Sequence, residues 1–187
     1  MNSRAGYVLA GGQSKRMGRD KALLKYGDGA LVQQVAQAVA KAAGSAVLVG
    51  SPARYGSLGY GVTPDVYPGE GPLGGILTAL QNSAADWSLI VACDMPALTA
   101  EFLSRLFTTA EACGGDVLAP AGPTGKLEPL CAVYHRRSGQ GLYRAFESGV
   151  RSVVRALQEV RTVTWNLPDA EFFHNVNTPE DWSAYAG

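Results

Sequence analysis

Apolar residues follow two patterns along this chain of 187 residues. Short apolar runs predict buried strands at residues 7–10, 46–49 and 88–93, and later strands are expected at 116–120, 129–134 and 161–165. Apolar residues at helical spacing predict helices, at 30–43, from 73 onwards, and at 100–110, 140–147 and 150–157. Because strands and helices alternate, we expect an α/β fold in three layers, with a mostly parallel sheet between helices on both faces.

Residues typical of helix ends stand at the edges of these patterns. Pro72 suits a first helical position, because its missing N–H would have no partner there. Thr99 can cap the helix that follows it, and Thr178 with Pro179 predicts a further helix near the C-terminus. No repeat, low-complexity tract or linker interrupts the order, so residues 1–187 are expected to form a single domain.

The composition excludes several kinds of partner. Lys plus Arg and Asp plus Glu number 16 each, so no net charge favours nucleic acid or an anionic membrane surface. The three cysteines are widely spaced and form no C-x-x-C pair for zinc or redox chemistry. The sequence shows no N-terminal leader pattern and no apolar run near the ~18 residues of a membrane span. We therefore expect a cytoplasmic protein with no nucleic-acid or membrane partner.

The first apolar run breaks into a glycine-rich loop with several cations. Gly11 and Gly12 have no Cβ, so backbone N–H groups there can approach oxyanions closely. The loop also carries four basic side chains, Lys15, Arg16, Arg19 and Lys21. This combination suits a polyphosphate, with the fork of Arg16 and the mobile ammonium of Lys21 as its main charges. The alternative is an ordinary strand-to-helix turn with a solvated basic rim.

Two common glycine motifs do not fit this loop. Five residues separate Gly12 from Gly18, which excludes the Walker spacing, and G-x-G-x-x-G is also absent. The segment L-A-G-G-Q-S-K-R-M-G-R-D-K resembles nucleotidyltransferases with a Rossmann-like fold, and more narrowly the molybdenum cofactor guanylyltransferases. The resemblance implies that the loop wraps a nucleoside triphosphate, that Lys21 contacts it, and that its base and sugar lie against the backbone of three residues, Leu9, Ala10 and Gly11.

A second candidate is Asp94, which directly follows the apolar run at 88–93. A rigid strand would hold its carboxylate at the sheet edge, as a magnesium ligand in a phosphate site requires. Without the basic loop, an aspartate that only forms the turn before Pro96 would be an equal alternative. The C-D-M-P sequence resembles the element of guanylyltransferases that carries the magnesium-binding aspartate, which implies Mg²⁺ as cofactor.

A third candidate is the loop D-V-Y-P-G-E-G-P-L-G-G, which begins at Asp65 and enters a helix. Helix N-termini attract anions and polar ligands, and a carboxylate could pair with the N–H donors of guanine. The loop resembles D-x-x-P-G-x-G-P-L-[AG]-G of the same family, where the aspartate binds nucleotide. The residues leave open whether Asp65 meets the base or the ribose.

The resemblance continues to the C-terminus. The sequence F-F-H-N-V-N-T-P-E-D is similar to the family's last motif and implies that Asn175 and Asn177 face a pterin. The G-V-R-S-V segment implies that Arg151 meets the acceptor phosphate. Both histidines, His135 and His174, are expected to be ordinary surface or packed residues. One departure is Gly50-Ser51, since the family often has Asn after the second strand.

Taken as a whole, the resemblance implies an enzyme that uses GTP and molybdopterin or molybdenum-molybdopterin. It would transfer GMP to the pterin's terminal phosphate and release pyrophosphate. Arg16, Lys21 and Asp94 would be catalytic. Proteins that deliver the pterin or mature molybdoenzymes are expected partners. Two alternatives remain open: a transferase of the same superfamily that uses CTP on molybdopterin or a nucleotide on a sugar phosphate, and a nucleotide-binding module without catalysis.

Overall fold

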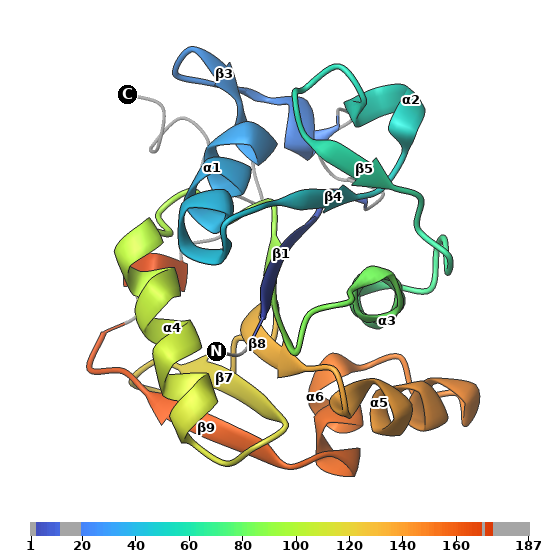
Figure 1. The fold of residues 1–187 in the computed structure, drawn as a ribbon, viewed down its shortest axis with the longest axis vertical. Helices are drawn as coiled ribbons and strands as arrows, with labels where there is room; N and C mark the ends of the chain where they lie inside the picture. Colours follow the sequence, from blue (N-terminus) through green and yellow to red (C-terminus); the bar gives the residue numbers. More distant parts are fainter. Residues whose placement is uncertain (1–2, 12–19, 170, 174–187) are drawn as a thin grey trace.

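The computed structural model describes residues 3–11, 20–169 and 171–173, and within them seven strands form one sheet (Figure 1). Their order across the sheet is β5-β4-β1-β6-β8-β7-β9. The strands are β1 (Arg4–Leu9), β4 (Val47–Val49), β5 (Gly61–Thr63), β6 (Trp87–Ala92), β7 (Val117–Ala121), β8 (Cys131–His135) and β9 (Thr162–Asn166). All neighbours pair in parallel except those of β8, which runs antiparallel to both β6 and β7.

Helices cover both faces of this sheet, as the alternating pattern predicts. On one face lie α1 (Leu31–Ala43) and α4 (Ala100–Ala112), and on the other α3 (Pro72–Asn82), α5 (Ser138–Glu147) and the short α6 (Val153–Ala156) (Figure 1). Successive residues of β1 point to opposite faces, so Val8 packs in the core under α1 and α4, while Tyr7 and Leu9 pack with α3. The expected three-layer α/β fold is confirmed.

Helix ends lie where the residues predict them. Pro72 is the first residue of α3 after Gly71, and Thr99 accepts a hydrogen bond from the Phe102 N–H at the start of α4. The carboxyl end of α1 is closed by Gly44, whose φ of 83° is left-handed. No helix in the described part of the chain is long and apolar enough to cross a membrane.

Several short elements were not predicted. They are α2 (Pro52–Tyr55), the strand β5, the hairpin of β2 (Lys25–Tyr26) and β3 (Gly29–Ala30), and the 3₁₀ turns η1 (Lys21–Leu23), η2 (Leu157–Glu159) and η3 (Glu171–Phe173). Elements of two to four residues are too short to show a hydrophobic period. The helix expected from Thr178 lies outside the described residues.

Candidate active site

The first loop and Asp94 leave the sheet side by side. Strands β1 and β6 pair in parallel with Leu9 opposite Ala92, and the Cys93 N–H donates to the Leu9 carbonyl at 3.2 Å. The chain passes from β1 to β4 and β5 on one side of the sheet, then returns to β6 on the other. Ligands of such sheets bind beyond the carboxyl ends of the strands at this reversal.

Lys21 and Asp94 meet at this edge. The Lys21 ammonium lies 3.2 Å from Oδ2 of Asp94, and the two side chains are only 14% and 21% exposed. Lys21 is held by the turn η1, which Asp20 caps by accepting a hydrogen bond from the Ala22 N–H at 3.1 Å. Lys21, which follows the first loop, and Asp94, which follows β6, are two of the predicted catalytic residues. They are therefore in direct contact.

The second carboxylate oxygen of Asp94 fits a metal ion. Oδ1 is shielded from solvent and has no hydrogen-bond partner among the described residues. Buried carboxylate oxygens are normally satisfied, so this atom is a vacant hard donor of the kind that Mg²⁺ prefers. The described residues contain no group of three potential metal-ligating side chains. Asp94 therefore suits the common arrangement in which Mg²⁺ is held by one or two carboxylates and the substrate's phosphates.

The backbone at the end of β1 is bonded within the fold. The N–H groups of Ala10 and Gly11 both donate to the Val49 carbonyl, at 3.0 and 3.2 Å. In this arrangement the Gly11 donor joins β1 to β4, so an oxyanion bound by backbone N–H groups of the glycine loop would have to use other amides. Leu9 is buried, whereas Gly11 is exposed. A ligand could therefore pack against the backbone of Gly11, although the Gly11 N–H is already hydrogen-bonded.

The loop from Asp65 to Pro72 lies beside the end of β1. Oδ1 of Asp65 accepts hydrogen bonds from the Tyr67 N–H and the Thr78 hydroxyl, both at 3.0 Å, which ties the loop to α3. A Cβ on Gly75 would lie 3.2 Å from a Leu9 methyl carbon, so the first turns of α3 pack closely on β1. Asp65 thus shapes this loop whether or not it also binds a nucleotide.

Arg151 contacts the same loop. Its guanidinium forms an ion pair with Glu70, donates to the Phe146 carbonyl at 2.7 Å, and lies 4.0 Å from the centre of the Phe146 ring. Phe146 in turn packs against Tyr67, with ring centres 4.8 Å apart. Since both charged side chains of the Arg151–Glu70 pair are nearly half exposed, Arg151 stands at an accessible rim of the loop.

Some predicted site residues cannot be placed. Gly12, Arg16, Asn175 and Asn177 lie outside the described residues. The beginning of the C-terminal motif is described: the Phe172 ring stacks on Phe102 of α4 with centres 4.4 Å apart, and the Phe173 ring meets Phe102 edge-on. His135 packs edge-on against Trp87, as expected of a packed histidine.

Sequence comparison places the chain among known proteins. The family described as the MobA-like NTP transferase domain matches residues 6–161. The chain belongs to this family. A probable molybdenum cofactor guanylyltransferase from Nostoc sp. is 35% identical over 100% of this chain and 92% of its own length. Another from Pelotomaculum thermopropionicum is 37% identical over 94% and 88%.

Structural comparison agrees with this assignment. Molybdopterin-guanine dinucleotide biosynthesis protein A from Archaeoglobus fulgidus has a TM-score of 0.83 and 25% identity, covering 98% of this chain and 96% of that one. The family resemblance inferred from the sequence is confirmed. This MobA-like NTP transferase therefore shares its fold with the Archaeoglobus protein, and the Lys21–Asp94 pair lies within that fold.

Sequence reasoning missed three residues beside the Lys21–Asp94 pair. The Tyr55 hydroxyl lies 2.7 Å from the Ala10 carbonyl and 2.9 Å from Asp20 Oδ2, and Arg54 also donates to Asp20 at 3.3 Å. Both Arg54 and Tyr55 belong to α2, which is too short to be recognised. The available signal was Gly50-Ser51, which departs from the family pattern just before this helix.

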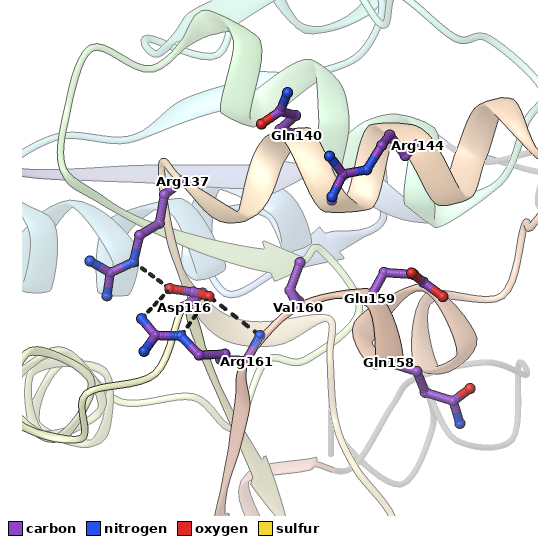
Figure 2. A pocket seen from close by; sticks show the side chains of 9 residues that line it. Asp116, Arg137, Gln140, Arg144, Gln158, Glu159, Val160 and Arg161 are labelled. Atoms are coloured by element: carbon purple, nitrogen blue, oxygen red, sulfur yellow. Dashed lines mark hydrogen bonds and ion pairs between the residues drawn. The ribbon is translucent and has the colours of Figure 1, made fainter.

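A polar groove of about 470 Å³ lies at the opposite edge of the sheet of this MobA-like NTP transferase (Figure 2). Asp116 precedes β7 and Arg161 precedes β9, whereas β1 and β6 end at the Lys21–Asp94 edge. The Asp116 carboxylate accepts from both Arg137 and Arg161, and hydrogen bonds from Arg161 first, then Arg137, hold its pKa well below the usual range. The rest of the groove is lined mainly by residues of α5 and η2. Because it lies where β7 and β9 begin, the groove is separate from the candidate active site.

Proposed function

We propose that this chain transfers GMP from GTP to the terminal phosphate of molybdopterin, with or without bound molybdenum. An oxygen of the acceptor phosphate attacks the α-phosphorus of GTP. The bond from that phosphorus to the bridging oxygen breaks, and its electron pair leaves with pyrophosphate. Support comes from membership of the MobA-like family and from relatives named molybdenum cofactor guanylyltransferase over nearly the whole chain.

The observation that carries this proposal is the convergence of Lys21 and Asp94 at the carboxyl ends of β1 and β6. Lys21 would follow the α-phosphate and the departing pyrophosphate, because an ammonium on a flexible stem neutralises charge as it moves between oxygens. Asp94 would hold Mg²⁺ through Oδ1, which has no partner among the described residues, and that ion would supply further positive charge to the triphosphate. Arg16, which the structure does not describe, is proposed to add a second cation.

The proposed reaction needs no general base, and the thiol beside Asp94, Cys93, is not an activated nucleophile. The attacking phosphate is already ionised near neutral pH, so no proton must be removed from it. Burial, with a smaller contribution from the Asp94 charge, raises the pKa of Cys93 to about 12. A thiol in that state is protonated and a poor nucleophile. We therefore propose direct transfer between the two substrates, driven by positioning and charge neutralisation, without a covalent enzyme intermediate.

The other substrate contacts are proposals of the same kind. The nucleoside would lie against Leu9, Ala10 and Gly11, with Gly12 and Asp65 completing its pocket beside the N-terminus of α3. The acceptor would be met by Arg151, whose guanidinium matches a phosphate, and by Asn175 and Asn177. Proteins that deliver the pterin or receive the product would dock around this edge.

The test is pyrophosphate release from each of the four nucleoside triphosphates, with Mg²⁺ and molybdopterin present. The proposal predicts turnover with GTP and a guanine dinucleotide product. Turnover with CTP alone would make the chain a cytidylyltransferase, and turnover only with a sugar phosphate would change the acceptor. Binding of GTP without any pyrophosphate release would indicate a nucleotide-binding module and would overturn the proposal.

A further inference from the structure

Tyr55 joins the two points at which the first loop meets the rest of the fold. Its hydroxyl lies 2.7 Å from the Ala10 carbonyl, just before residues 12–19, and 2.9 Å from Asp20 Oδ2, just after them. The ring is buried, with 2% of the residue exposed. A single side chain from α2 therefore contacts both flanks of the loop that carries the predicted triphosphate-binding residues.

The fold keeps a space for this ring at Gly50. A Cβ on Gly50 would lie 2.7 Å from Cε2 of Tyr55, closer than real Cβ contacts come. Gly50 does not have a positive φ, so the glycine is needed for space rather than for backbone conformation.

The carboxylate that Tyr55 contacts is bonded on both oxygens. Oδ1 of Asp20 accepts from the Ala22 N–H, which forms the turn η1, and Oδ2 faces Tyr55 and Arg54. The hydroxyl has one proton and two acceptors, so it shares that proton between the Ala10 carbonyl and Asp20. Burial, followed by the hydrogen bond to Asp20, raises the Tyr55 pKa, which keeps this proton in place across the working range of pH.

We propose that Tyr55 is a positioning residue for the triphosphate. Its hydroxyl fixes Asp20 against the end of β1, and Asp20 begins the turn that places the Lys21 ammonium 3.2 Å from Asp94. This inference rests on the proposed function only in taking Lys21 as a triphosphate ligand. It concerns any nucleoside triphosphate at this loop, whichever base and acceptor the enzyme prefers.

The test compares Tyr55→Phe with Tyr134→Phe. Tyr134 is an equally buried tyrosine on β8, and its hydroxyl donates to the Pro129 carbonyl at 2.6 Å. Both variants lose one buried hydrogen bond while keeping the ring, so both should lose similar thermal stability. Only Tyr55→Phe should weaken GTP binding, by about 10-fold in Kd and in KM, the size found when a partner that orients a ligating group is removed.

A double-mutant cycle separates positioning from stability. If the hydroxyl acts through Asp20, adding Tyr55→Phe to Asp20→Ala should change the GTP affinity much less than it does in the wild-type chain. Full additivity, or a Tyr55→Phe variant that binds GTP as well as Tyr134→Phe does, would overturn the inference. Kd values for GTP and CTP are measured directly, so the result stands even if wild-type protein shows no guanylyl transfer and the proposed function fails.

Discussion

The Lys21 ammonium lies 3.2 Å from Oδ2 of Asp94, although 73 positions separate the two residues in the chain. They meet because β1 and β6 are neighbours in the sheet, with Leu9 opposite Ala92. Asp94 keeps its other oxygen buried and without a partner among the described residues. We propose that Lys21 and a metal ion on Oδ1 of Asp94 would face one ligand, and that the negative charge of a triphosphate would match both.

The first prediction concerns the cation. Lys21→Ala should lower kcat/KM for GTP on the order of 10²-fold, because charge on the phosphates in the transition state would lose a preorganised partner. Steady-state pyrophosphate release measures this. Lys41→Ala is the control, since Lys41 is exposed in the last turn of α1, just before β4 begins and so at the end of the sheet opposite Asp94. Equal losses in both variants would show that Lys21 has no special role.

A second prediction separates the two substrates. Glu70 holds Arg151 at the rim of the Asp65–Pro72 loop. Arg151→Ala should raise KM for the molybdopterin acceptor about 10- to 100-fold, because a charge-assisted hydrogen bond to its phosphate would be lost. KM for GTP should change little. Arg155→Ala, at an exposed position on α6, provides the control.

The acceptor assignment depends on which KM moves. If Arg151→Ala raised KM for GTP and left that for the acceptor unchanged, Arg151 would belong to the nucleotide side of the site. Arg151→Lys should recover only part of the loss, because an ammonium keeps the charge but not the two-pronged geometry.

Most of the fold could be predicted because it depends on local signals. The apolar period of α1 gave its limits within one residue, and the cap at Thr99 marked the start of α4. The position of Tyr55 could not be predicted in this way. Its role comes from contacts with Ala10 and Asp20, which are 45 and 35 positions away and depend on the completed sheet.

The sequence predicted the positions of some candidate site residues better than those of others. Asp94 directly follows a strand that can be recognised, so its place at the carboxyl edge follows from a parallel sheet. Lys21 was also expected at that edge, but the turn that brings it to Asp94 begins at Asp20 and is not visible in the strand pattern. The bonding of the Gly11 N–H to Val49 was not foreseen, because a glycine loop by itself does not reveal which amides the neighbouring strand uses. The Asp116 cluster was missed for the same reason, since its partners Arg137 and Arg161 come together only at the sheet edge.

A third prediction concerns stability and pH. Asp116 has a pKa held below its unfolded value of about 3.9, so its contribution to folding is complete above that value and is lost as pH falls toward the folded pKa. Asp116→Asn should therefore lower the free energy of unfolding at pH 7. The loss should be only about 1–2 kcal/mol, because solvent screens the partly exposed arginine partners. Urea unfolding between pH 7 and pH 2 measures this. The gap from wild type should shrink as pH falls below about 4, and a constant gap would contradict the assignment.

The most direct test of the account is pyrophosphate release by Asp94→Asn at saturating GTP, molybdopterin and Mg²⁺. Asp86→Asn is the matched control, because Asp86 precedes β6 and Asp94 follows it. Both variants should remain folded. Asp94→Asn should lose on the order of 10²-fold or more in rate, while Asp86→Asn turns over like wild type. If Asp94→Asn kept the wild-type rate, Asp94 would not hold the metal, and Lys21 and Asp94 would not act on one triphosphate.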